Sequence, residues 1–366
     1  MDTNHPDFIP PHCPNPDCLY HQQLTAGWRF KRIGSFRRQA HPHCIRRFTC
    51  LHCRRSFSTQ TFSTSYWLKR PDILPQLPTK TTGCMANRQI ARDLHVAPST
   101  IDRQLSRLGR HCLLYHTRHM RTAKPLSTIA IDGLVSFEFS QFFPFHHHLA
   151  VDPGSDFMPY FTDSEVRRSG TMTPAQKRER QRLETAHGKP DPKAVFKDVK
   201  HLLEVVTGGH RRVTVLSDEH KTYPLVLREL GCEIIHLVTS SQERRDAGNP
   251  LFPINLADLV LRHSSANHKR ETIAWSKRRQ SSAERLAIFL VWRNYMTGRR
   301  QKVRGSPTPA QVRGMVDHRV GVAELLEGRL FVSRIGLPSR WAEYYWRTVR
   351  TRVLPRQRRH ELRYAV

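Results

Sequence analysis

Two aspartates, each directly after a short apolar run, are the residues of this sequence best suited to metal-ion chemistry. Residues 213–216 read Val-Thr-Val-Leu and precede Ser217 and Asp218, and residues 127–131 read Ser-Thr-Ile-Ala-Ile and precede Asp132. Such runs are typical of central strands, and a carboxylate at the C-terminal end of a strand lies where α/β folds place ligands. Because Mg²⁺ prefers carboxylate oxygens, two such aspartates in one sheet predict a divalent-metal site. A polar turn after an ordinary strand is the alternative interpretation.

Cysteine pairs near the start of the chain predict a second, different metal site. Five of the eight cysteines lie in the first 53 residues. In a long intracellular chain, clustered cysteines are more often metal ligands than disulfides. Two pairs separated by a loop can close a tetrahedral zinc site, and four protein ligands make that zinc structural. The expected ligands are Cys13, Cys18, Cys50 and Cys53, with His12, His21, His43, Cys44 and His52 as substitutes.

Residues 87–108 have the pattern of two helices joined by a tight turn. Ile90 and Leu94 share one face of the first helix, Pro98 breaks the pattern, and Ser99 is a suitable N-cap for the second helix. Such a second helix fits the major groove of DNA, where Arg and Gln read base edges. The residues expected to face DNA are Ser99, Thr100, Arg103, Gln104 and Arg107. An ordinary helical hairpin, or arginines that contact only phosphate, are the alternatives.

From residue 126 onward, predicted strands alternate with helices. Strands are expected at 129–132, 146–152, 157–162, 213–216 and 233–238, helices at 194–206 and 223–230, and a charged loop at 167–193. Three strands, helix, strand, helix, strand is the order of a ribonuclease H-like fold. The predicted fold class is therefore multidomain α/β: a zinc ribbon, a helix-turn-helix, and a ribonuclease H-like catalytic domain with a mixed sheet.

The net charge indicates a nucleic-acid partner. Sixty Lys and Arg against 31 Asp and Glu give +29 over 366 residues. A basic protein of the membrane surface is the competing interpretation. No apolar run approaches the roughly 18–20 residues of a spanning helix, and no signal peptide opens the chain. We expect a soluble protein of the cytosol or nucleoid, with no membrane partner.

A zinc ribbon, a helix-turn-helix and two strand-end aspartates in this order resemble a bacterial insertion-sequence DDE transposase. Residues 267–277 and 282–287 are similar to the C-terminal helices of that enzyme class, and the likeness covers roughly residues 10–300. The resemblance implies a zinc ribbon at 1–65, a DNA-binding helix-turn-helix at 80–120, a ribonuclease H-like catalytic domain at 125–300 and a basic extension at 301–366. It also implies metal-dependent cleavage of terminal inverted repeats and strand transfer to target DNA, by a homo-oligomer in the bacterial cytoplasm.

The family uses three carboxylates to bind two Mg²⁺ or Mn²⁺ ions, so the resemblance implies a third acid beside Asp132 and Asp218. Asp258 follows Asp218 by 40 positions, near the common spacing in the family, although the family usually has Glu there. Glu271 and Glu284 are the rivals, and either could instead be an ion-pair partner on a basic helix. The other nearby acids, which we rank lower, are Glu138, Asp152, Asp163 and Glu219.

Two further functions fit parts of the same pattern. A catalytically inactive zinc-finger and helix-turn-helix regulator would bind the repeats without cutting them. A nuclease or resolvase would cut without joining. The two aspartates favour an enzyme over a regulator, because a regulator has no need of acids in a basic groove.

Overall fold

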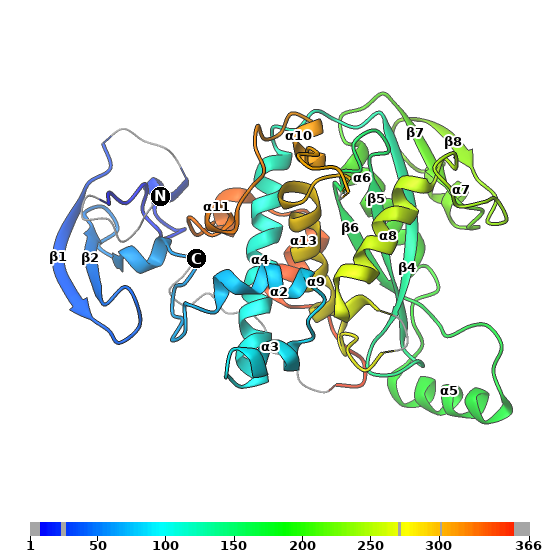
Figure 1. The fold of residues 1–366 in the computed structure, drawn as a ribbon, viewed down its shortest axis with the longest axis horizontal. Helices are drawn as coiled ribbons and strands as arrows, with labels where there is room; N and C mark the ends of the chain where they lie inside the picture. Colours follow the sequence, from blue (N-terminus) through cyan, green and yellow to red (C-terminus); the bar gives the residue numbers. More distant parts are fainter. Residues whose placement is uncertain (1–7, 23–26, 270–271, 301, 355–366) are drawn as a thin grey trace.

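The computed structural model describes residues 8–22, 27–269, 272–300 and 302–354. Its elements form three parts along the longest axis, visible from left to right in Figure 1. A small N-terminal sheet comes first, a group of helices lies in the middle, and a larger sheet covered by helices follows. The larger sheet and the N-terminal sheet are the parts that position the candidate sites.

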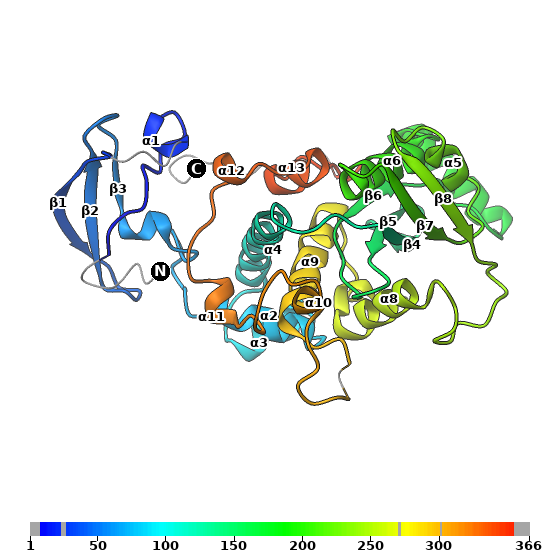
Figure 2. The ribbon, with the colours of Figure 1, turned by 90° about the horizontal axis from the view of Figure 1, so that it is seen from above.

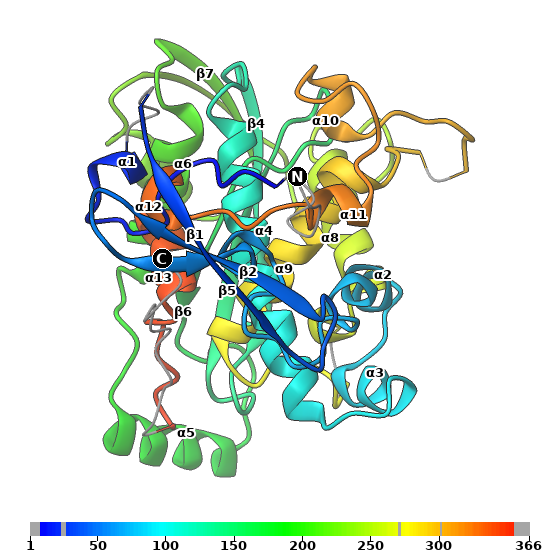
Figure 3. The same cartoon turned by 90° about the vertical axis from the view of Figure 1, so that its left-hand side faces the viewer.

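The N-terminal part is a three-stranded antiparallel sheet with a small aromatic core. Its elements are α1 (Leu19–Gln22), β1 (Phe30–Arg37), β2 (Cys44–Cys50), β3 (Ser56–Ser58) and η1 (Thr59–Phe62), with strand order β1-β2-β3. Phe48, Phe57 and Phe62 pack with Phe331, which comes from near the far end of the chain. Figure 3, viewed from this side, shows β1 and β2 in front of the central helices.

The middle part is built around two packed helices, α4 (Pro98–Met120) and α9 (Arg279–Val291). They approach so closely at Gly109 that a Cβ there would overlap the backbone of Glu284. The other elements of this part are η2 (Leu74–Gln76), α2 (Leu77–Thr82), α3 (Asn87–Asp93), the π-helical turn η4 (Trp292–Met296), α10 (Pro309–Val312), α11 (Val322–Leu325), α12 (Val332–Ile335) and α13 (Ser339–Trp346).

The larger sheet is mixed and five-stranded, as the sequence predicts. Its strands are β4 (Thr128–Phe137), β5 (Pro144–Val151), β6 (Phe161–Glu165), β7 (Arg212–Ser217) and β8 (Glu233–Val238), in the order β6-β5-β4-β7-β8. β5 runs antiparallel to β4 and β6, whereas β7 is parallel to β4 and β8. The covering helices are α6 (Ala194–Thr207), α7 (Tyr223–Leu227) and α8 (Phe252–Ser264), followed by η3 (Ala266–His268). α6 and α8 lie on opposite faces (Figure 2).

Two local predictions differ from the structure. The third strand is Phe161–Glu165 instead of 157–162, because residues before Phe161 form a turn bridged by Asp152 and Phe157. The expected loop at 167–193 contains the helix α5 (Pro174–His187), which has a Thr173 cap and no buried residue. An isolated polar helix lacks the apolar face on which the sequence argument for helices depends.

One hydrophobic core joins the middle helices to the larger sheet. It runs from Ile73 and Ile90 through Leu105 of α4 to Leu134 of β4 and Tyr344 of α13. The helical segment 80–120 and the C-terminal segment therefore share a core with the α/β unit. In the described part of the chain, no helix is long and apolar enough to cross a membrane.

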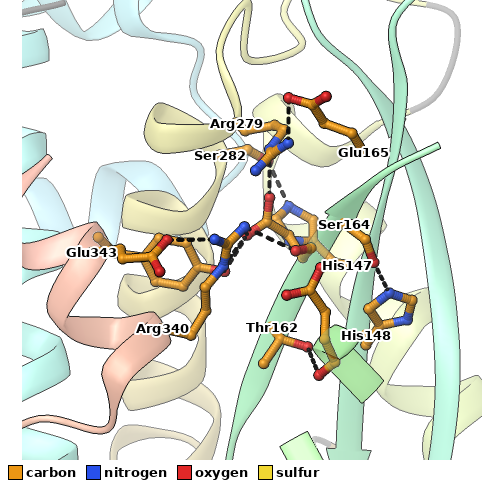
Figure 4. A network of polar contacts seen from close by, with 12 residues as sticks. His147, His148, Thr162, Ser164, Glu165, Arg279, Ser282, Arg340 and Glu343 are labelled. Atoms are coloured by element: carbon orange, nitrogen blue, oxygen red, sulfur yellow. Dashed lines mark hydrogen bonds and ion pairs between the residues drawn. The ribbon is translucent and has the colours of Figure 1, made fainter. Parts of the chain in front are cut away.

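A buried ionic cluster fixes two helices against the edge strand β6. The Asp163 carboxylate lies 2.7 Å from Arg279 Nε of α9 and 2.8 Å from Arg340 Nη2 of α13. Glu165 lies 2.7 Å from Arg279 Nη1. Figure 4 shows these arginines between the strand and the helices. Removal of one partner would leave a buried unpaired charge, which typically costs about 3–5 kcal/mol.

Candidate functional site

Asp132 lies inside a strand, whereas Asp218 follows the end of one. β4 continues beyond Asp132 to Phe137, because β5 remains paired with it up to Pro144. The predicted strand-end position is therefore wrong for Asp132. On the other side of β4, β7 ends at Ser217, and Asp218 follows directly, as predicted.

The two aspartates are nevertheless neighbours. The parallel register pairs Ala130 with Leu216, and each aspartate lies two residues further along the chain, Asp132 within β4 and Asp218 just past the end of β7. Residues at the same level of adjacent parallel strands lie side by side. The negative charge of Asp218 raises the pKa of Asp132, as expected for two close carboxylates.

The surroundings of Asp132 disfavour its charged form unless a cation is near. Burial raises the pKa of Asp132 most, and the charge of Asp218 adds to this effect. The Gly133 N–H donates to Asp132 Oδ1 at 2.6 Å and, with Arg245 and His220, opposes the rise in pKa. The His220 N–H donates to Asp218 Oδ1 at 3.0 Å, which fixes that carboxylate.

Tyr223 connects this pair to Asp258. Its ring is buried at the start of α7. Burial raises the pKa of the Tyr223 phenol, and the charges of Asp132, Asp218 and Asp258 raise it further. Asp258 lies on α8, which packs against β4 and β5. The charges of all three carboxylates therefore act on this one phenol.

The three aspartates are more widely spaced than a single-metal cluster. Among the described residues, the four cysteines are the one group of three or more His, Cys, Asp or Glu whose ligand atoms lie within 4.8 Å of one another. A pair of cations about 3.5–4 Å apart needs ligands on both sides, and so a wider set of carboxylates. The chemistry of the donor set, all carboxylate oxygens, fits Mg²⁺ or Mn²⁺.

Sequence reasoning missed a group of polar side chains around Gly133, the residue after Asp132 in β4. A Cβ built on Gly133 would lie 3.5 Å from His146 Nδ1, 3.8 Å from His148 Nδ1 and 3.9 Å from Tyr223 Oη. Burial lowers the pKa of His146 to about 4, so this imidazole is neutral near pH 7. The alternation of His146 and His148 in a predicted strand was the available signal, since alternate residues share a face.

The other acids are engaged elsewhere in the described structure. Glu284 is fully buried on α9, where Ser106 Oγ donates to it at 2.8 Å and Arg347 Nε lies 3.3 Å away. This places Glu284 between α4 and α9, apart from the aspartates. Glu271 lies outside the described residues. Of the lower-ranked acids, Glu138 accepts hydrogen bonds from the Arg279 backbone and Thr351, and Glu219 accepts one from the Ser241 backbone. Asp152 pairs with Arg313, and Asp163 pairs with Arg279 and Arg340.

The four predicted cysteines converge at the base of the N-terminal sheet, and this buried group could hold zinc. The Sγ atoms of Cys13 and Cys53 are 3.6 Å apart, and those of Cys18 and Cys50 are 4.0 Å apart. Tetrahedral zinc with Zn–S bonds of about 2.3 Å separates its sulfurs by about 3.8 Å. All four cysteines are free of disulfides. Burial opposes ionisation of Cys50, but hydrogen bonds from the Trp28 indole and nearby amides outweigh it and lower its pKa to about 7.

The substitute ligands lie outside this group. His21 Nδ1 contacts the Cys13 carbonyl at 2.8 Å and its Nε2 contacts Ser333 Oγ at 2.6 Å. His12 packs edge-on against Phe62. Cys44 is exposed. His43 Nδ1 contacts the Arg38 carbonyl, and the His52 ring packs against Tyr20.

The helix pair offers a smaller DNA-facing surface than predicted. Ser99 and Arg103 are exposed and Thr100 is half-buried. Gln104 is 3% exposed and donates to the Arg70 carbonyl at 2.9 Å, and Arg107 donates to the Thr64 carbonyl at 3.2 Å.

The outward orientation predicted for Gln104 and Arg107 is therefore wrong. The segment that follows η1 lies over this face of α4, and its carbonyls accept a hydrogen bond from each of the two side chains. The predicted N-cap at Ser99 is also wrong. The cap is Ala97, because Pro98 already has helical geometry and occupies the first turn.

Comparison with known proteins gives a likeness to solved structures. No protein-family model matches the chain, and no curated protein matches it. The crystal structure of the catalytic domain of Mos1 mariner transposase is similar, with a TM-score of 0.25 and 13% sequence identity, over 66% of this chain and 92% of that chain. The proposals below therefore rest on the residues of this chain.

The arrangement separates two kinds of metal chemistry. Buried thiolates at the N-terminal sheet suit a cation held for stability, because no position is left open for a substrate. Carboxylates between β4 and β7 suit hard cations such as Mg²⁺, which keep bound waters that a substrate can replace. A phosphodiester is one substrate whose chemistry uses both divalent cations and a basic protein surface.

Proposed function

We propose that this chain is a DDE-type DNA transposase with a ribonuclease H-like catalytic unit. It would bind the terminal inverted repeats of an insertion sequence, cleave the DNA at these ends and join them to target DNA. The observation that carries the proposal is the placement of Asp132 in β4 and of Asp218 directly after the parallel neighbour β7, with Asp258 on the covering helix α8, in a chain of net charge +29. The strand order β6-β5-β4-β7-β8 supports the assignment of the catalytic unit.

Each aspartate has a position that suits a metal ligand. Asp132 and Asp218 approach from adjacent strands, and Asp258 approaches from α8. Two cations bound there would stabilise the attacking and leaving oxygens of a phosphodiester. The Gly133 and His220 N–H groups orient two of the carboxylates before any cation arrives. Asp258 is the third acid in this proposal, and Glu271 is its rival.

The remaining parts of the proposal concern DNA and assembly. Zinc at the four cysteines would stabilise the N-terminal sheet. Ser99, Thr100 and Arg103, at the start of α4, would contact double-stranded DNA. Because two element ends must meet, we propose a homo-oligomer. It would work in the bacterial cytoplasm, at the nucleoid.

The test uses the purified full chain, labelled element ends, a target plasmid and Mg²⁺. Asp218→Asn should lower cleavage and joining at least about 10³-fold, since metal stabilisation of the transition state is worth several kcal/mol. It should leave binding to the ends unchanged. Glu219→Gln is the matched control, because this neighbouring acid is exposed and contacts the Ser241 backbone. Parallel tests of Asp258→Asn and Glu271→Gln identify the third acid.

The products separate the proposal from its alternatives. Joined products support the transposase. Cleavage without joining would indicate a nuclease or resolvase. Binding without cleavage, under Mg²⁺ and under Mn²⁺, would indicate a regulator and overturn the enzyme proposal. Loss of DNA binding in Asp218→Asn would mean that Asp218 is structural.

A further inference from the structure

A groove of about 440 Å³ on the N-terminal sheet borders the candidate zinc site at Cys13, and none of the candidate carboxylates lines it. Its walls include Phe36 of β1, Arg47 of β2, Arg55 before β3, and Tyr66 and Trp67 after η1. Its volume lies in the range typical of pockets for small molecules and nucleotides. The groove therefore has room for a flat group between its aromatic and basic walls.

Trp67, in the wall of this groove, combines an exposed side chain with a rare backbone conformation. The side chain is 72% exposed, and its backbone has φ of +60°, which bulky residues rarely adopt. Phe36 is 45% exposed beside the same groove. A strained backbone that presents a bare indole to solvent needs support from its surroundings, and such strain is concentrated at binding sites.

The charges around the groove favour an anionic chain. Arg47 and Arg55 line it and are both exposed. Residues 18–71 contain no Asp or Glu. Of the two acids that flank this range, Asp17 lies 3.7 Å from Arg55 in an exposed ion pair, which contributes little in water, and Asp72 pairs with Arg70 at 2.8 Å.

We propose that this groove binds an unpaired nucleotide of DNA, with its base stacked on Trp67 and the adjoining phosphates near Arg47 and Arg55. An aromatic face can take a base only after that base has left the duplex stack, so the groove selects single-stranded over double-stranded DNA. The inference deepens the proposed function, on which it rests for its DNA partner. It adds a site for melted DNA that is separate from the carboxylates.

The test measures binding of a labelled oligothymidylate to the full chain by fluorescence anisotropy. Trp67→Ala should weaken this binding roughly 5- to 150-fold, the range expected for loss of one base–aromatic stack. Trp67→Phe should retain most of the affinity. Phe139→Ala is the matched control, because Phe139 is also exposed (53%), also has positive φ (+49°) and lies on the α/β unit. Zinc content and the melting temperature verify that each variant is folded.

A second variant tests the phosphate contacts. Arg47→Gln with Arg55→Gln should reduce the slope of log affinity against log salt by roughly 0.7 per lost contact on single strands. Affinity for a hairpin duplex should change less than affinity for the oligothymidylate in both the Trp67 and the arginine variants.

The outcomes distinguish this inference from the proposed function. Equal oligothymidylate affinity of Trp67→Ala and the parent chain overturns the inference, whatever the cleavage assay shows. An equal loss for Phe139→Ala also overturns it, because the effect would then be nonspecific. A selective loss in Trp67→Ala supports the groove even if the parent chain cleaves no DNA, in which case only the proposed catalysis fails.

Discussion

Asp163 and Asp198 face the same two arginines, yet their pKa values move in opposite directions. Burial opposes ionisation of Asp163, but the guanidinium groups of Arg279 and Arg340 outweigh it and hold its pKa well below the usual value. For Asp198 on α6, burial outweighs the same arginines, and its pKa rises to about 6. The arginines are already paired with Asp163, whose charge also raises the pKa of Asp198.

The substitution Asp198→Asn should stabilise the protein near neutral pH. The folded chain holds the Asp198 proton up to about pH 6, and the unfolded chain loses it near pH 4, so parent stability falls as pH rises between these values. At pH 7 the variant should gain about 1–3 kcal/mol in free energy of unfolding. Urea unfolding at pH 4, 6 and 7 measures this gain.

Glu204→Gln is the control for that substitution, because Glu204 is an exposed acid on the same helix. Its unfolding free energy should follow the parent curve at every pH. A loss of stability in Asp198→Asn of the same size at pH 4 and pH 7 would mean that the carboxylate acts through hydrogen bonds instead of its charge.

For single residues, the sequence identifies Asp132 and Asp218 as candidate metal ligands but does not identify the residues around them. An apolar run followed by an acid is a local signal, so both residues can be found without a structure. The extension of β4 past Asp132 depends on its antiparallel pairing with β5, which the residues around Asp132 alone do not show. Tyr223 gives no local signal, because its position depends on how α7 packs against α6 and β8.

Among the elements, α4 differs most from expectation. The pattern of residues 99–108 is that of a recognition helix, but the helix continues to Met120 and packs along α9. Burial of Gln104 depends on the segment at residues 64–70, which contacts α4 across more than 30 positions of sequence. Amphipathic periodicity predicts which face is buried, but it cannot predict a loop that covers part of the other face.

Gly109 should be essential to the contact between α4 and α9. A methyl group there would overlap the Glu284 backbone, which cannot rotate away as a side chain could. Gly109→Ala should therefore lower the free energy of unfolding by about 3 kcal/mol or more, despite the better helix propensity of Ala. Gly231→Ala is the matched control, because a Cβ at Gly231 meets nothing within 4 Å. Equal melting temperatures for both variants would contradict the close packing.

The whole molecule joins a cysteine-rich module, residues 8–62, to a large α/β unit with its own core. The module has few buried apolar residues, so its stability should depend on the metal. The order of strands and helices in the large unit follows from sequence periodicity. Sequence periodicity does not predict that residues 80–120 share a hydrophobic core with that unit, because this depends on which apolar faces pack together.

Removal of zinc should unfold the module while the α/β unit stays folded. Treatment with a chelator, or Cys50→Ser, should abolish hydrogen-exchange protection of β2 and leave that of β5 unchanged. Cys44→Ser is the control, since Cys44 is exposed and outside the sulfur cluster. Retained protection of β2 after complete metal removal, verified by elemental analysis, would show that the aromatic core alone suffices.

Residues 329–335 complete this module from the far end of the chain. The Arg329 N–H donates to the Phe62 carbonyl at 2.8 Å, Phe331 fills the module's core, and Ser333 contacts His21. A ribosome makes residues 8–62 long before it adds this segment, so the growing chain carries an unfinished module throughout most of its synthesis. A chain that ends before residue 329 lacks Phe331, which packs on Phe62, and lacks the contacts that orient β1 and β2. The complete module therefore forms only in chains whose translation has run past residue 335.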